Sequence, residues 1–174
     1  MLEIKKISKE FDKDLEKIIR DCLIEYNLNI PGTAWEDPYL DKFSEYYKDI
    51  NGDYYIAFWN GELAGGCGYG PLPDEANTCE LQKLYIKKEL RKYGIGQALV
   101  DKVEKEASKD YEKIYLETAE SMESAIRFYK KNNYKSLCTP LGNTGHNSCG
   151  TFFIKDLVTT QASHKDAIFF SFSL

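Results

Sequence analysis

Residues 81–97 read LQKLYIKKELRKYGIGQ, an apolar strand followed by a short charged turn and the start of a helix. Gly94 and Gly96 remove two β-carbons where the chain turns from strand to helix, so successive backbone N–H groups can close in on one anion. The helix that follows adds its unpaired first amides and the positive end of its dipole. That helix carries apolar residues four apart: Leu99, Val103 and Ala107. The stretch therefore predicts a loop that holds a phosphate or pyrophosphate.

Two common phosphate loops do not fit this pattern. A Walker loop needs Lys and Ser or Thr after its last glycine, but Gln97 and Ala98 follow Gly96. A dinucleotide fingerprint needs a third glycine where Leu99 stands, so a nucleotide-binding domain is disfavoured. The pattern Arg-x-x-Gly-x-Gly that begins at Arg91 resembles the pyrophosphate loop of the GNAT superfamily of acyl-CoA-dependent N-acyltransferases.

The resemblance extends over residues 1–157. Residues 80–86 look like the fourth strand of that family, and residues 113–118 look like its fifth strand. The segment AIRFYKKNNY, residues 125–134, is similar to its motif B helix and exit turn. The resemblance implies a single α/β GNAT domain, with a mixed, mostly antiparallel sheet flanked by helices and a splayed central strand pair. It also implies that an acetyl group passes from acetyl-CoA, the co-substrate, to a primary amine by direct attack in a ternary complex.

The bulk properties fit one acyltransferase domain. At 174 residues and 43% hydrophobic content, the chain is long enough for one domain with a real core. A net charge of −5 argues against a nucleic-acid partner and is compatible with a cationic substrate, either a small molecule or a peptide amine. Five cysteines without a Cys-x-x-Cys pair suggest reduced thiols. No apolar signal segment or membrane-length run is present, so we expect a cytoplasmic protein without a membrane partner.

Local patterns predict the remaining elements. Strands are expected at residues 2–7, 53–59, 62–69, 134–138 and 151–157, and helices at residues 12–26 and 37–50. Asp37 and Pro38 provide an N-cap and a first helical residue for the second of these helices. Asn60-Gly61 predicts a type I′ hairpin, and the glycines that crowd the next strand predict a bulge or a close backbone approach. The tail 158–174 lies outside the resemblance. Three interpretations of it stay open: a strand on its own sheet, a strand on a neighbouring subunit in a homodimer, or disorder.

The resemblance assigns the two halves of the co-substrate to backbone groups. The amides of the pantetheine arm pair with the splayed fourth strand at Leu84, Tyr85 and Ile86, and an N–H of this strand faces the developing oxyanion. The pyrophosphate belongs to the loop formed by Arg91, Lys92, Tyr93, Gly94, Ile95, Gly96 and Gln97. The side chain of Arg91 either reaches a phosphate or is simply solvated.

Glu80 is the candidate general base. It shares a strand face with Gln82 and Leu84, and the resemblance implies that a carboxylate here takes the ammonium proton through water. Such an acceptor is needed because an amine with a pKa of about 10.4 is almost fully protonated at pH 7. The alternative is a strand-end carboxylate in a salt bridge.

Tyr129 is the candidate general acid, because the resemblance points its hydroxyl at the thioester sulfur; the alternative is a packed core tyrosine. Where many relatives place an asparagine before this helix, the chain has Met122, which leaves Ser121 or Ser124 as substitute contacts to the co-substrate. A silent acyl-CoA-binding module that uses the same loop as a sensor is the main alternative function. Such a module has no need of Glu80 and Tyr129.

The acceptor pocket is expected at the loop between the first two helices. Aromatic and acidic residues there predict either an ammonium cage or a packed capping loop: Tyr26, Trp35, Glu36, Asp37 and Tyr39. His146 lies in a loop that often borders this pocket, so it is either a substrate contact or a loop histidine without a role. With Cys149 it makes only half of a zinc site, which His164 does not complete, so no metal site is predicted.

Overall fold

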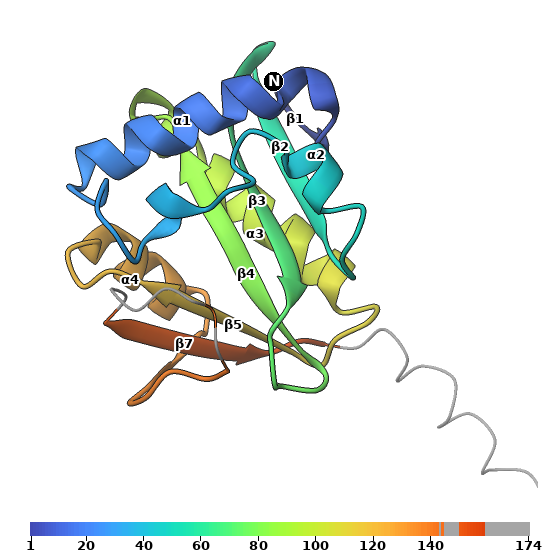
Figure 1. The fold of residues 1–174 in the computed structure, drawn as a ribbon, viewed down its shortest axis with the longest axis vertical. Coiled ribbons are helices and arrows are strands. Elements are labelled where there is room, and N and C mark those ends of the chain that lie inside the picture. The colour runs from blue at the N-terminus through green and yellow to red at the C-terminus, as the bar shows by residue number, and fades with distance from the viewer. Residues whose placement is uncertain (143, 145–149, 159–174) are drawn as a thin grey trace, which may run out of the picture.

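A computed structural model of the protein describes residues 1–142, 144 and 150–158 (Figure 1). Its single sheet has the strand order β1-β2-β3-β4-β5-β7-β6. The strands are β1 (Leu2–Lys6), β2 (Asp53–Trp59), β3 (Glu62–Pro71), β4 (Thr78–Ile86), β5 (Lys113–Thr118), β6 (Lys135–Leu137) and β7 (Thr151–Asp156). Neighbouring strands are antiparallel except for β4 and β5, which are parallel. The expected mixed, mostly antiparallel sheet is confirmed.

Helices cover both faces of this sheet (Figure 1). The α-helices are α1 (Asp12–Glu25), α2 (Phe43–Tyr46), α3 (Ile95–Ala107) and α4 (Glu123–Lys131), and the short 3-10 helices are η1 (Lys9–Phe11), η2 (Ala34–Glu36) and η3 (Lys88–Tyr93). α1 and α2 pack on one face through a core that contains Leu15, Ile19 and Phe43. α3 and α4 pack on the other face, where Leu99, Val103 and Tyr129 are buried. The apolar spacing that predicted α1 and α3 is the spacing that buries them.

The hairpin between β2 and β3 has the predicted turn. Asn60 and Gly61 both have positive φ angles, 51° and 86°, as a type I′ turn requires. The close backbone approach is also confirmed, because a β-carbon on Gly65 would lie 2.0 Å from the carbonyl oxygen of Tyr85. Bulky residues are excluded there, so β3 and β4 come together closely beside the splayed pair.

The helix predicted over residues 37–50 is wrong in its extent, since α2 spans only Phe43–Tyr46. Asp37 is not the N-cap of α2, which is Lys42; it follows the end of η2 instead. Its backbone is extended, and its carboxylate lies 2.6 Å from the Nζ of Lys83 on β4. Leu40 and Phe43 are nevertheless buried as the pattern required. A long-range ion pair therefore overrides the local start signal.

β4 and β5 separate after a short parallel ladder. They pair only where Thr78, Cys79 and Glu80 lie opposite residues 113–115, and the remainder of β4 diverges while β5 stays paired with β7. The register of β3 against β4 shifts between Gly66 and Gly68, and Lys83 in this stretch has a φ of 54°. This bulge turns β4 away from its neighbour, which opens the splayed pair that was expected.

Within the described residues, no helix has both the length and the apolar character needed to cross a membrane.

Candidate functional site

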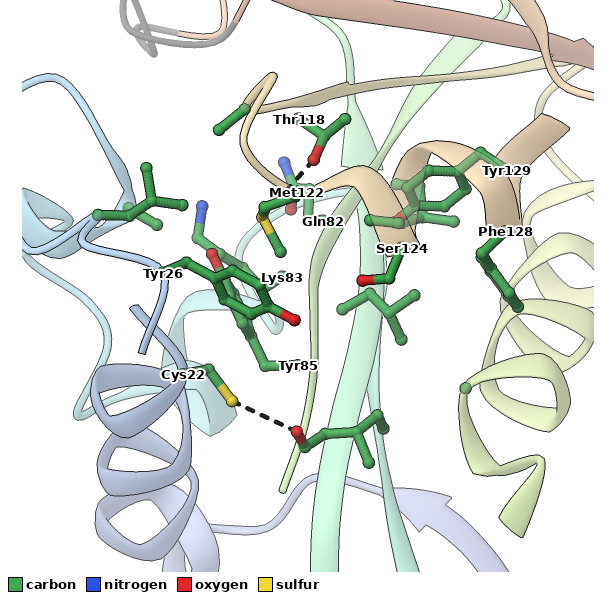
Figure 2. Close-up of a pocket in the computed structure, with 18 of the residues that line it drawn as sticks. Cys22, Tyr26, Gln82, Lys83, Tyr85, Thr118, Met122, Ser124, Phe128 and Tyr129 are labelled. Atoms are coloured by element: carbon green, nitrogen blue, oxygen red, sulfur yellow. Dashed lines mark hydrogen bonds between the residues drawn. The ribbon is translucent and has the colours of Figure 1, made fainter. Parts of the chain in front are cut away.

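A pocket of about 410 Å³ fills the split between β4 and β5 (Figure 2). Its walls come from the C-terminal half of α1, the start of η2, the diverging part of β4, the end of β5, α4 and the first turn of α3. We call its two ends the η2 end and the α3 end. The η2 end is lined by Thr33, Ala34, Glu80, Gln82 and Lys83, and the α3 end by Arg91, Gly94, Gly96 and Gln97.

The edge of β4 offers backbone groups to this pocket. The N–H of Lys87 donates to the carbonyl of Ala64 at 2.8 Å, so Lys87 and Ala64 form a hydrogen-bonded pair of the antiparallel ladder with β3. Hydrogen-bonded pairs alternate along such a ladder, so the next one is Tyr85 opposite Gly66. The peptide groups of Leu84 and Ile86 therefore face the split, where the sequence analysis placed the pantetheine arm. The backbone of Tyr85 belongs to the ladder with β3, and its side chain lines the pocket.

The α3 end is suited to an anion. Gly94 has a φ of 74°, a left-handed conformation in which α3 begins without a side-chain cap and without an acidic residue in its first turn. The first amides of a helix have no partner inside it, so Ile95, Gly96 and Gln97 present donors at the positive end of the helix. A β-carbon on Gly96 would meet nothing within 4 Å, and Gly94, Gly96 and Gln97 all line the pocket. These features fit a pyrophosphate group.

The side chains of the other loop residues point elsewhere. The ring of Tyr93 stacks on Trp59 with centroids 4.9 Å apart, and Lys92 lies over Tyr93. Neither residue lines the pocket. Gln97 donates to the side chain of Asn132, 2.6 Å away, and so ties the first turn of α3 to the end of α4.

Arg91 lines the pocket, but its guanidinium is held by the protein itself. It forms an ion pair with Glu25 at 2.8 Å, donates to the hydroxyl of Tyr26 at 3.0 Å and donates from Nε to the carbonyl of Ile86 at 3.0 Å. This hydrogen bonding to Arg91 lowers the pKa of the Glu25 carboxyl. Arg91 is therefore a clamp between α1, the end of β4 and the loop, a contact that the sequence analysis did not anticipate.

Glu80 lies at the η2 end, where the ladder between β4 and β5 stops. It is 9% exposed, and its carboxylate accepts a hydrogen bond of 2.8 Å from the amide of Gln82. Gln82 in turn accepts a hydrogen bond of 2.7 Å from the hydroxyl of Tyr47. This relay fixes the orientation of the carboxylate at the pocket wall. Gln82 shared a predicted strand face with Glu80, and Tyr47 was expected on the buried face of the predicted helix, but its contact with Gln82 was not anticipated.

Tyr129 lines the opposite wall. Figure 2 shows its ring extending from α4 toward β4, near Ser124. The side chain is 6% exposed and packs against Tyr134 and Phe153, as a core tyrosine does. It also lines the pocket, as a general acid must. Burial raises the pKa of the Tyr129 phenol well above its usual value, so the phenol keeps its proton at neutral pH. Met122 and Ser124 both line the pocket, and Ser121 does not.

The structure describes two of the three predicted acceptor contacts, Tyr26 and Trp35, and places them differently. Tyr26 lines the pocket, but the guanidinium of Arg91 lies over its ring at 5.4 Å. Trp35 is not in the pocket wall, and the guanidinium of Arg20 lies over its ring, 4.7 Å from the ring centroid. The protein's own cations thus occupy these aromatic faces, which favours the packed capping loop over the ammonium cage. His146 lies outside the described residues, as do Cys149 and His164.

Comparison with known proteins identifies the family. The sequence profile of the Acetyltransferase (GNAT) family matches residues 14–134, well over half of the chain. The protein belongs to the GNAT acetyltransferase family. The GNAT profile runs from the first turn of α1 to the residue before β6, so it includes the split, the loop, Glu80 and Tyr129.

Individual GNAT relatives agree over nearly the full length. The protein is 28% identical over 157 residues to the uncharacterized N-acetyltransferase YjgM of Escherichia coli K12, which covers 88% of this chain and 94% of the relative. A GNAT acetyltransferase of Staphylococcus aureus Mu50 superposes with a TM-score of 0.80 at 23% identity, over 91% of this chain and all of that one. The PaiA N-acetyltransferase of Thermoplasma acidophilum, solved with coenzyme A, gives a TM-score of 0.69 at 21% identity, over 90% and 99% of the two chains.

Proposed function

We propose that the protein transfers an acetyl group from acetyl-CoA to a primary amine by direct attack within a ternary complex. One observation carries the proposal: the uncapped first turn of α3, the open edge of β4, Glu80 and Tyr129 all meet in one pocket. The related PaiA enzyme was solved with coenzyme A, which supports the same ligand here. Bound acetyl-CoA would supply the activated acyl group.

The chain's own residues would divide the work between the two ends of the pocket. The amides of Ile95, Gly96 and Gln97 bind the pyrophosphate. The peptide groups of Leu84 and the N–H of Ile86 orient the pantetheine arm along β4, since the carbonyl of Ile86 already accepts from Arg91. This arrangement leaves the thioester between Glu80 and Tyr129, with a β4 N–H available to the carbonyl oxygen as it gains negative charge. The η2 end then receives the acceptor amine.

Proton movements follow from the positions of Glu80 and Tyr129. As the amine nitrogen bonds to the acyl carbon, its proton passes through water to the carboxylate of Glu80, which the Gln82 amide orients. As the carbon–sulfur bond breaks, the phenol of Tyr129 gives its proton to the sulfur, which leaves as the thiol. Tyr129 is the group kept protonated by burial, and Glu80 is the group placed beside the η2 end.

An amine panel tests this function. Small monoamines, diamines, amino sugars and short peptides are incubated with acetyl-CoA, while thiol release is followed and acetylated product is identified by mass spectrometry. We expect at least one amine to be acetylated at a rate well above acetyl-CoA hydrolysis. Tight acetyl-CoA binding without acetylation of any amine would support the silent sensor module instead.

A further inference from the structure

Lys83 is a buried cation in the pocket wall that the proposed chemistry does not use. Its side chain is only 6% exposed, and its Nζ lies 2.6 Å from the carboxylate of Asp37, which is 15% exposed. Burial opposes the charge of this ammonium, but the carboxylates of Asp37 and Glu80 outweigh it and raise the pKa of Lys83. A buried ion pair of this kind contributes little net stability compared with apolar packing, so its presence calls for another explanation.

The backbone of Lys83 is also exceptional. Six residues other than glycine have a positive φ in the described part of the chain, and five of them are Asn or Asp, which tolerate this region. Lys83, at 54°, is the sixth, and it lies inside a strand. A lysine gains nothing locally from this conformation, so tertiary contacts must maintain it.

Those contacts hold Lys83 at both ends of the residue. The hydroxyl of Tyr54 donates to its carbonyl oxygen at 2.8 Å, and Asp37 holds its ammonium group. The left-handed turn lies directly before Leu84, whose peptide groups face the split. The conformation of Lys83 therefore sets the direction in which β4 leaves the ladder.

The other partner, Asp37, does not line the pocket itself but directly follows the segment that forms the wall of the η2 end. Its N–H donates to the carbonyl of Ala34 at 3.3 Å, and Ala34 and Thr33 line the pocket. On its other side this segment is attached to α1, because the carbonyl of Trp35 accepts from Arg20 and the ring of Trp35 lies against the same guanidinium. The ion pair connects the segment across the pocket wall to β4.

We propose that Lys83 and Asp37 form a positioning pair, which holds residues 33–37 at a fixed distance from the left-handed turn of β4 and so sets the geometry of the η2 end. This inference rests on the proposed function, in which the η2 end receives the amine. Neither residue contacts the reacting atoms. The pair acts through Leu84 on the thioester side and through Thr33 and Ala34 on the amine side.

Kinetics of Lys83→Met and Asp37→Asn test the pair, using the best amine from the panel. We expect kcat/KM for the amine to fall at least tenfold in each variant, while the Kd for coenzyme A changes by a much smaller factor, because the first turn of α3 is still in place to bind the pyrophosphate. The double variant should be no worse than the single ones, because both remove one interaction. Lys83→Arg keeps the pair and should recover most of the loss.

A matched control separates positioning from general stability. Lys155 on β7 forms an ion pair with Glu104 at the same 2.6 Å, with side chains 22% and 16% exposed and outside the pocket wall. Lys155→Met should lower the melting temperature and leave kcat/KM unchanged. If Lys83→Met and Asp37→Asn behave like this control, or if their affinity for coenzyme A falls by the same factor as kcat/KM, the inference is overturned.

A structural readout keeps the test independent of turnover. The chain has two tryptophans, so Trp59→Phe leaves Trp35, within residues 33–37, as a single probe. Acrylamide should quench Trp35 more strongly when Lys83→Met or Asp37→Asn is added, and no more strongly when Lys155→Met is added. Unchanged quenching in the first two variants would overturn the inference. A wild-type protein that acetylates no amine would refute the proposed function and leave this measurement decisive for the pair.

Discussion

The first turn of α3 gives the sharpest test of the anion site, through Gly96→Asp with Gly96→Asn as its neutral control. The new side chain meets no protein atom within 4 Å at its β-carbon, and Gly96 has an ordinary φ. α3 has neither a cap nor an acid in its first turn, so a carboxylate there should interact favourably with the helix dipole. That interaction is typically about 0.3–1 kcal/mol. For a domain of this size the melting temperature should rise by about 1–4 °C relative to Gly96→Asn.

The same carboxylate should repel the pyrophosphate. Two unit negative charges about 5 Å apart repel by about 3 kcal/mol at an effective dielectric constant of about 20. The Debye length at physiological salt is about 8 Å, and we take this screening to halve the repulsion energy. About 1.5 kcal/mol remains, so the Kd for coenzyme A should be about tenfold weaker in Gly96→Asp than in Gly96→Asn.

Isothermal titration calorimetry with coenzyme A at low and high salt provides the measurement, and differential scanning calorimetry gives the stability. The difference between the two variants should shrink as salt is added. Acetylpantetheine, which lacks the pyrophosphate, should serve as a substrate equally well for both. If Gly96→Asp binds coenzyme A as tightly as Gly96→Asn does, the first turn of α3 does not hold the pyrophosphate.

Four further substitutions probe the other parts of the site. Tyr129→Phe keeps the ring packing and should lower kcat by about 10²–10⁴-fold with little change in coenzyme A affinity. Because burial raises the pKa of Tyr129 far above neutrality, the loss in kcat should be the same from pH 6 to pH 9. A loss below threefold would mean that the tyrosine has a structural role. Glu80→Gln should be slow at neutral pH and recover partly as the pH approaches the pKa of the amine, about 10.4, whereas an equal loss at every pH would indicate a positioning role. Arg91→Met and Glu25→Gln should weaken coenzyme A binding similarly if Arg91 acts as a clamp, and a loss in Arg91→Met alone would indicate a direct phosphate contact. Arg91 lowers the pKa of the Glu25 carboxyl in the folded protein. The stability from this ion pair is therefore present above the unfolded carboxyl pKa of about 4.3 and is lost as the pH falls through the lower folded pKa. The melting temperatures of wild type and Arg91→Met should converge at acid pH.

Features that depend on neighbouring residues could be read from the sequence. The Asn60-Gly61 turn, the apolar face of α1 and the glycine loop before α3 all follow from backbone preferences and a fixed residue spacing. The strand period placed Glu80 on one face with Gln82, but the roles of Glu80 and Tyr129 came from the resemblance to the GNAT family, and both residues line the pocket.

The tertiary structure decided what depends on partners far apart in sequence. Asp37 has a good local signal for starting a helix, yet its carboxylate pairs with a buried lysine on β4 and its backbone stays extended. Arg91 turns to Glu25 on α1, and Tyr47 reaches Glu80 through Gln82. Most of the elements and the anion loop follow from the sequence, because each has a local period or backbone requirement, and the resemblance to the GNAT family supplied the candidate acid and base. The pairing of charges and the support of the pocket wall became known only from the folded chain, because long-range ion pairs and hydrogen bonds leave no period in the sequence.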